Sequence, residues 1–167
     1  MAAPLAVHQV SIWVQHGQIL LGDAEEGDLA AIEDAWDDAV DSGRYVGTAG
    51  GIVDLVTPVA DSAGTPVTVE QWATEPPDDR AGWDHEADID IDVPSGRIEL
   101  FLTTGEIEGG TVTLAGAGPY RLRVSARFGR GKAGAAVDDV YRLRLWPRAA
   151  DLPPQLRRGW PHWPRLR

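Results

Sequence analysis

The stretch "GWDHEADIDIDVPSG", residues 82–96, alternates acidic and branched aliphatic side chains through its centre. An alternation with a period of two residues is typical of a β-strand that has one buried and one exposed face. The acidic positions of the alternation are Asp88, Asp90 and Asp92. Four roles are open to these carboxylates: binding a metal, facing a basic partner, pairing with arginines of the same chain, or keeping one strand face solvated.

The same alternation recurs along most of the chain and predicts the fold class. Clusters of glycine, proline, serine or aspartate separate the alternating runs at the short spacing typical of sandwiches and barrels. We therefore predict an all-β fold, an antiparallel β-sandwich. The predicted strands span residues 5–14, 18–22, 50–57, 66–73, 85–93, 97–103, 111–115, 119–128 and 140–146.

Two segments depart from the strand period. In residues 28–41 apolar side chains recur at intervals of three and four, which predicts one short amphipathic helix capped by Asp28. Residues 151–167, rich in proline, arginine and tryptophan, predict an extended tail after a sandwich domain at residues 1–150. The apolar stripe of the helix consists of Leu29, Ile32, Trp36 and Val40.

The net charge of −11 is distributed unevenly along the 167 residues. Residues 1–108 contain 23 acidic and 3 basic side chains, whereas residues 109–167 contain 3 acidic and 12 basic ones. This division indicates either two halves that attract each other or a face suited to a cationic partner. We expect no direct nucleic-acid binding, because contacts to phosphate require positive surface.

The sequence also limits the chemistry and the location of the protein. It contains no cysteine, which excludes disulfides, thiolate metal sites and a cysteine nucleophile. It has neither a basic leader followed by an apolar stretch nor a run of about 20 apolar residues. We therefore expect no membrane segment and a cytoplasmic location.

Metal binding and catalysis find little support in the sequence. Carboxylates two positions apart on a strand are spaced by roughly 6.6 Å, so three in a row do not converge on one ion. The segment "GRGKAG", Gly129–Gly134, has dinucleotide-site spacing, but a strand follows where that site needs a helix, so we predict a hairpin loop. The histidines and serines form no recognised catalytic motif. We expect no metal, no cofactor and no enzymatic activity.

Arginines alternate with apolar residues in the segments 119–128 and 140–146. If either strand pairs with the acidic strand, opposite charges meet across the ladder, and each pair contributes roughly 0.2–1 kcal/mol. The arginines on these strands are Arg121, Arg123, Arg127, Arg142 and Arg144. The tail carries further arginines around Trp160 and Trp163, and in an acidic protein we expect it to dock on the protein's own acidic face.

Three segments carry a resemblance to known proteins: "VHQVSIWVQHGQILL" at residues 7–21, "GPYRLRVSAR" at 118–127 and "YRLRLWP" at 141–147. Together they resemble a group of β-rich proteins of high-GC bacteria. More distantly, the order of strands and turns is similar to the competence protein J family, whose members are small acidic inhibitors of a DNA nuclease. The resemblance implies an inhibitor-like or immunity-like β-sandwich and carries over no catalytic residue.

These observations lead to two main hypotheses of function. The first is a non-enzymatic acidic protein that binds a protein partner with a basic surface, such as a nuclease. The second is a self-contained structural or assembly module in which the acidic and arginine-rich parts satisfy each other; a small-molecule-binding or enzymatic sandwich is third. The candidate partner-binding residues are Asp84, Glu86, Asp88, Asp90 and Asp92 on the strand and Glu33, Asp34, Asp37 and Asp38 on the helix.

Overall fold

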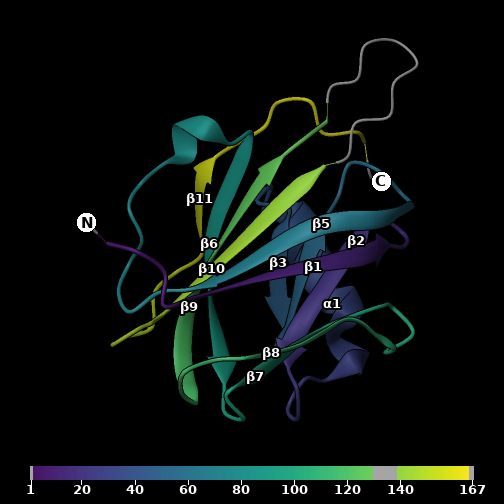
Figure 1. The fold of residues 1–167 in the computed structure, drawn as a ribbon. Helices are drawn as coiled ribbons and strands as arrows, with labels where there is room; N and C mark the ends of the chain where they lie inside the picture. Colours follow the sequence, from purple (N-terminus) through teal and green to yellow (C-terminus); the bar gives the residue numbers. More distant parts are fainter. Residues whose placement is uncertain (1, 130–138, 166–167) are drawn as a thin grey trace.

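Two β-sheets pack face to face in the computed structural model, which describes residues 2–129 and 139–165, and one α-helix lies outside the smaller sheet (Figure 1). The six-stranded sheet contains, in spatial order, β1 (Ala6–Val14), β5 (Ser62–Gln71), β10 (Val140–Pro147), β9 (Gly118–Arg127), β6 (His85–Val93) and β11 (Gln155–Arg158). The five-stranded sheet contains β3 (Val46–Ala49), β4 (Ile52–Val56), β2 (Gln18–Asp23), β7 (Arg97–Phe101) and β8 (Ile107–Thr113). The predicted all-β sandwich is confirmed.

Besides shifted ends, such as those of β5 and β8, the strands differ from the prediction in their number, in one pairing direction and in the tail. Residues 46–56 form a hairpin of two strands, because Gly50 and Gly51 both adopt positive φ and turn the chain. The strands β10 and β5 run parallel, with Tyr141 opposite Val67, whereas every other strand pair in the described residues is antiparallel. The extended tail is confirmed, but it also contributes the edge strand β11.

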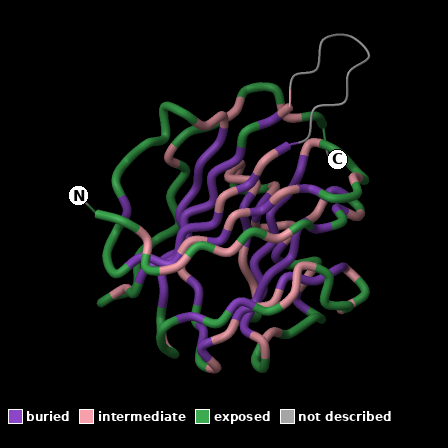
Figure 2. Tube along the Cα trace, in the orientation of Figure 1, coloured by how far each residue is buried: buried purple, intermediate pink, exposed green. Residues whose placement is uncertain are grey.

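The core lies between the two sheets and is built from the inward-facing residues of both. Ile12, Val69 and Leu122 of the larger sheet and Leu21 and Leu100 of the smaller one are fully buried in it. The middle strands of the six-stranded sheet are buried over most of their length, on both faces (Figure 2). Burial on both faces requires a cover on the outer side of this sheet.

The helix α1 (Ile32–Asp41) follows a short 3-10 turn, η1 (Leu29–Ala31), and packs on the outer face of the five-stranded sheet. The Asp28 side chain accepts a hydrogen bond from the Ala30 amide at 3.0 Å, so the predicted cap residue caps η1, whereas α1 itself begins after Ala31 without a side-chain cap. The packing face is formed by Ala35 and Ala39, which are fully buried against Gly47, where a Cβ atom would collide with the helix backbone.

The apolar stripe predicted for the helix coincides with its packing face only at Ile32, which packs beside Ala35. Leu29 is 49% exposed, and Ile32, Trp36 and Val40 are only partly buried, because the helix lies too close to the sheet for large side chains at the contact. In the described residues no helix has the length and apolar character needed to cross a membrane. The loop predicted at "GRGKAG" lies outside the described residues except for Gly129.

Candidate binding surface

The acidic strand β6 pairs antiparallel with the arginine-rich strand β9. Asp88 lies opposite Arg123 and Asp90 opposite Arg121. The Arg123 guanidinium donates from Nε and Nη2 to the two oxygens of Asp88 at 2.8 and 2.9 Å, and Arg121 donates to Asp90 at 2.7 Å. Alternation places all these side chains on one outer face of the sheet, and of the four roles open to the carboxylates the structure shows the pairing with arginines of the same chain.

Two segments cover this outer face and add charges of their own. The first is residues 72–84, which include the 3-10 turn η2 (Arg80–Gly82). From it Glu75 accepts from Arg123 at 2.7 Å, and Asp79 accepts from Arg142 at 2.6 Å. The second is the tail, from which Arg157 donates to Glu86 at 2.8 Å.

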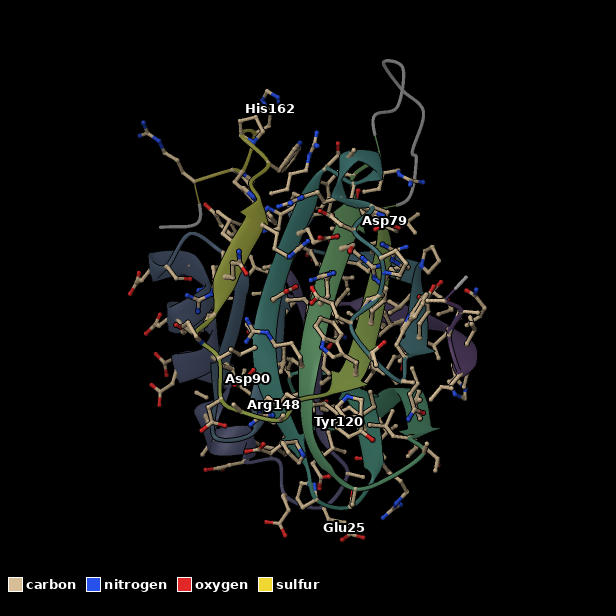
Figure 3. The ribbon with its side chains drawn as sticks, turned by 90° about the vertical axis from the view of Figure 1, so that its left-hand side faces the viewer. Glu25, Asp79, Asp90, Tyr120, Arg148 and His162 are labelled. Carbon is tan, nitrogen blue, oxygen red and sulfur yellow. The ribbon has the colours of Figure 1, made fainter. Side chains whose placement is uncertain are left out.

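We refer to these charges together as the arginine network. Its members are Arg121, Arg123, Arg142, Arg144, Arg148 and Arg157 with Glu75, Asp79, Glu86, Asp88, Asp90 and Asp92. Arg148 joins it where the tail begins, next to Asp90 (Figure 3). Burial opposes the charged form of Arg123, but its hydrogen bonds to Asp88 and Glu75 raise the pKa of Arg123. The guanidinium therefore stays ionised inside the network.

The strand residues predicted to bind a partner lie mostly inside this network. Glu86 is fully buried and Asp88 is 3% exposed. Asp84 accepts a hydrogen bond from the Phe128 amide at 2.9 Å, and Asp90 binds Arg121 and Arg148. Only Asp92 keeps most of its side chain in solvent, 75% exposed, while it pairs with Arg148. A partner reaches Glu86 and Asp88 only if the covering segments leave the sheet.

The end of the tail docks through aromatic side chains. Trp163 stacks on Tyr45 with ring centroids 3.8 Å apart, and Trp160 packs against Phe128 at 4.3 Å. The Trp160 amide donates to Nδ1 of His85 at 3.2 Å, while Nε2 of His85 contacts the Arg44 carbonyl, and burial lowers the pKa of His85. A neutral imidazole fits both contacts, as a donor at Nε2 and an acceptor at Nδ1. The predicted docking of the tail on its own domain is confirmed.

The opposite side of the sandwich has the reverse character. Residues 18–56 and 97–113, which form the five-stranded sheet and the helix, carry 13 acidic and 2 basic side chains, a net charge of −11. The rest of the chain carries 13 of each and is neutral. We call this half of the sandwich the acidic side. Its two basic residues are already engaged, since Arg44 binds Asp38 at 2.7 Å and Arg97 binds Glu25 at 2.6 Å.

The predicted helix residues all belong to the acidic side. Glu33 and Asp34 are exposed, and Asp37 and Asp38 are partly exposed. Asp38 also accepts a hydrogen bond from the Thr48 amide at 3.0 Å, so it holds the helix to β3 as well. The structure does not bring the helix acids and the strand acids together, because they lie on the outer faces of different sheets.

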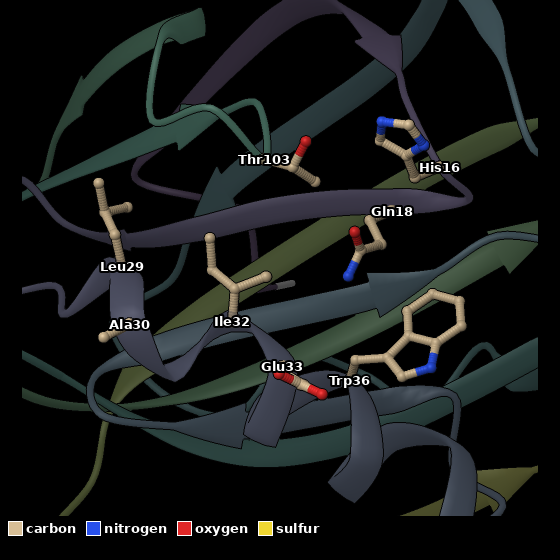
Figure 4. Close-up of a pocket in the computed structure, with 8 residues that line it drawn as sticks. All are labelled: His16, Gln18, Leu29, Ala30, Ile32, Glu33, Trp36 and Thr103. Atoms are coloured by element: carbon tan, nitrogen blue, oxygen red, sulfur yellow. The ribbon is translucent and has the colours of Figure 1, made fainter.

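A pocket of about 500 Å³ opens between the helix and the five-stranded sheet (Figure 4). Its lining includes His16, Gln18, Ile32, Glu33 and Trp36. His16 and Gly17 both have positive φ, which forms the turn predicted before β2 and brings His16 to the rim. Three members of the predicted helix stripe, Leu29, Ile32 and Trp36, therefore line the pocket.

Below the pocket lies a buried carboxyl group that sequence reasoning missed. Asp54 is fully buried on β4, and its side chain accepts a hydrogen bond from Gln18 at 2.6 Å. Its second oxygen has no partner in the part of the chain that the structure describes. Burial raises the pKa of Asp54 to about 7, against the effect of the Gln18 hydrogen bond. The sequence does contain a signal for this group, because Asp54 stands inside the apolar run "GGIVDLVT", where a strand is expected to be buried and a charged group is costly.

Metal ligands do not gather anywhere in residues 2–129 and 139–165. In these ranges no three His, Asp or Glu side chains lie close enough together to hold an ion. The carboxylates of the strand instead accept hydrogen bonds from arginines, whereas Glu33 and Asp34 of the helix are exposed to solvent. The arrangement on the acidic side is suited to the binding of cations by a surface.

Comparison with solved structures gives two proteins of the same fold. One is ComJ from Bacillus subtilis, described as an inhibitor of the DNA-degrading activity of NucA. It matches with a TM-score of 0.58 and 13% identity over 87% of this chain and 98% of ComJ. The other, crocagin biosynthetic gene J, matches with a TM-score of 0.55 and 18% identity over 86% of this chain and 99% of its own.

The comparisons confirm at the level of fold the remote resemblance to competence protein J. Both matches span nearly the whole of the known structures, so the shared fold includes both sheets. No family model matches the sequence, and no curated protein matches it.

Proposed function

We propose that this protein is a non-enzymatic inhibitor that binds a basic protein, such as a nuclease, through its acidic side. The observation that carries the proposal is the division of charge between the two halves of the sandwich. The arginine network neutralises one half within the molecule, whereas the other half keeps the whole net charge of −11. A surface with a charge of one sign attracts partners of the opposite sign and accelerates their association.

The fold supports the hypothesis that the protein is an inhibitor. ComJ has the same fold and is described as the inhibitor of a DNA-degrading protein. A nuclease must present a cationic surface to the phosphates of its substrate, and an acidic protein that covers this surface prevents substrate binding. The proposed partner is therefore a protein whose own ligand is polyanionic.

Within this proposal the predicted binding residues divide into two groups. Asp37 and Asp38, with Glu33 and Asp34, belong to the surface that meets the partner. The strand residues Asp84, Glu86, Asp88, Asp90 and Asp92 hold the covering segments in place. The second hypothesis is a module whose charges are compensated internally. It agrees with the six-stranded half, but the net negative charge of the acidic side is not compensated within that side.

The proposal is tested by capturing partners from the native cell at low salt. The protein is immobilised as wild type, as a helix triple variant (Glu33→Gln, Asp34→Asn, Asp37→Asn) and as a control triple variant with the same loss of charge. The control replaces exposed acids outside the acidic side, Asp61→Asn, Asp92→Asn and Asp151→Asn. We expect a basic protein to bind the wild type and the control, to dissociate as salt is raised, and to lose binding to the helix variant by at least tenfold.

Identification of the captured protein completes the test. Addition of purified wild-type protein should inhibit the activity of that partner on its polyanionic substrate. Capture that is lost with the control triple variant and kept with the helix variant would place the binding surface near Asp92 and contradict the proposal. A partner that is acidic, or whose binding does not respond to salt, would also contradict it.

A further inference from the structure

The pocket on the acidic side is an open groove of about 500 Å³ that combines apolar walls with negatively polarised groups (Figure 4). A cavity of this size is within the range of roughly 300–1,000 Å³ usual for ligand pockets. The helix and η1 supply one wall, and β2 with the turn after β7 supplies the other, where Gln18 and Thr103 lie. The pocket thus lies within the surface that we propose for the partner.

The large apolar side chains that line the pocket are partly exposed to solvent. Trp36 and Ile32 are only partly buried, and Leu29 is 49% exposed, although all three line the cavity. An indole ring attracts a cation placed over its face, and aliphatic side chains pack well against the methylenes of a long basic side chain. The walls therefore suit a cation at the end of an apolar stem.

Glu33 provides the full negative charge of the pocket. It lies one helical turn before Trp36, so the two side chains share one face of α1. Neither arginine of the acidic side binds Glu33, because Arg44 pairs with Asp38 and Arg97 pairs with Glu25. Its carboxylate is available for a cation that enters from outside.

Gln18 provides a second acceptor in a fixed orientation. Its Nε2 donates to the buried Asp54 at 2.6 Å, which leaves the carbonyl oxygen Oε1 of the same amide as an acceptor at the pocket wall. Asp54 is fully buried, so it acts on the pocket by positioning Gln18. The cavity thus offers acceptors on two different elements, the carboxylate of α1 and the carbonyl of β2.

We propose that this pocket binds an arginine side chain of the basic partner. The inference rests on the proposed function and adds to it the side chain that the pocket on this surface recognises. A guanidinium is planar and carries five N–H donors, so it stacks on Trp36 and donates to Glu33 and Gln18 at the same time. Lysine presents a compact charge without a plane, and we expect it to bind more weakly.

The test uses a capped amino acid and does not need the partner. N-acetyl-arginine amide is titrated into isotope-labelled full-length protein at low salt, and the signals of the Trp36 indole and the Gln18 amide are followed by NMR. We expect saturable shifts of both signals, with at least tenfold weaker binding of N-acetyl-citrulline amide, which has the same shape without the charge. N-acetyl-lysine amide should bind several-fold more weakly than arginine. Equal binding of the citrulline compound, or shifts confined to other residues, would overturn the inference.

Two neighbouring variants separate the pocket from general attraction by charge. Glu33→Gln should weaken binding of the capped arginine by about tenfold, because it removes the carboxylate inside the cavity. Asp34→Asn removes the same charge from the adjacent exposed position, which does not line the pocket, and should change the affinity by less than about twofold. An equal loss in both variants would refute specific recognition. Trp36→Leu, which keeps an apolar residue on the helix, should weaken arginine binding more than lysine binding.

The outcomes distinguish this inference from the proposed function. If the wild type captures a basic partner, the helix triple variant does not, and capped arginine does not bind, then the proposed function stands and the pocket has no part in it. If capped arginine binds but no basic protein is captured, then the pocket does recognise arginine and the proposed partner is contradicted.

Discussion

The two outer faces of this sandwich use the same residue types for different purposes. On the six-stranded sheet each carboxylate of β6 meets an arginine of a neighbouring strand or of a covering segment, and the charges hold the polypeptide together. On the acidic side the carboxylates outnumber the basic residues by 13 to 2. The role of an acidic residue therefore depends on what covers it, and the number of acids alone does not locate a binding surface.

The largest effect on stability is expected when a buried cation is removed from the arginine network. Arg123→Ala leaves the buried Asp88 without the guanidinium that donates to both of its oxygens, and we expect a loss of about 4 kcal/mol in the free energy of unfolding. Urea denaturation measures the loss. Arg127→Ala, on the same strand but at an exposed position, is the control and should cost less than about 1 kcal/mol. Similar costs in both variants would show that the network does not hold the fold.

The second prediction concerns the one fully buried carboxyl group of the acidic side. The pKa of Asp54 is about 7 in the folded protein, above the ordinary value of 3.8, so the folded state binds the proton more tightly. Stability should therefore fall as the pH rises from 5 to 8, by about 3 kcal/mol from this group alone. Asp54→Asn should remove this fall, which urea denaturation at both pH values measures. Asp61→Asn, at an exposed position, controls for the loss of a charge. A wild-type decrease that persists in Asp54→Asn would contradict the assignment.

The third prediction tests the docking of the tail. Trp163→Ala removes the ring that stacks on Tyr45 and packs near Phe128, and we expect a loss of about 2 kcal/mol in the free energy of unfolding. His162→Ala changes the exposed neighbour and should have little effect. Thermal denaturation compares the two variants. If Trp163→Ala is as stable as the wild type, the tail does not contribute to the domain.

The smallest effect is expected on the acidic side. The helix triple variant, which should weaken partner capture at least tenfold, removes three charges from an excess of acids, and its free energy of unfolding should change by no more than about 0.5 kcal/mol. The change should be small because the reduced repulsion between like charges is offset by the lost interaction of Glu33 and Asp34 with the N-terminal end of the helix. A loss of several kcal/mol in the free energy of unfolding would mean that these acids also stabilise the fold. The acids on the two outer faces would then have the same role.

The sequence predicted those features that depend on one strand or helix. The alternation in β6 and β9 predicted both strands and the placement of the arginines, and the spacing in residues 28–41 predicted the helix. Alternation gives the face on which Asp88 lies but not the strand that will lie beside it. For that reason the ladder remained one of several alternatives until the strand order was known.

The pocket was missed for a similar reason. Large apolar residues at helical spacing predict a packing face, but the helix contacts β3 through Ala35, Ala39 and Gly47, which allow a closer approach than leucine or tryptophan. The large residues are then displaced to the side of the contact. Asp54 was visible as an acid in an apolar run, yet only the tertiary structure places Gln18 beside it.

The parallel pairing of β10 with β5 has a consequence for the order in which the protein folds. β10 lies in the middle of the six-stranded sheet, between β5 and β9, although it comes late in the chain. Before residues 140–147 are in place, the larger sheet is divided into the pair β1–β5 and the pair β6–β9. Joining them requires contacts between residues as distant as Val67 and Tyr141, and such distant pairings slow folding. We expect the unpaired edges of β5 and β9 to make the incomplete chain prone to association with other chains during its synthesis.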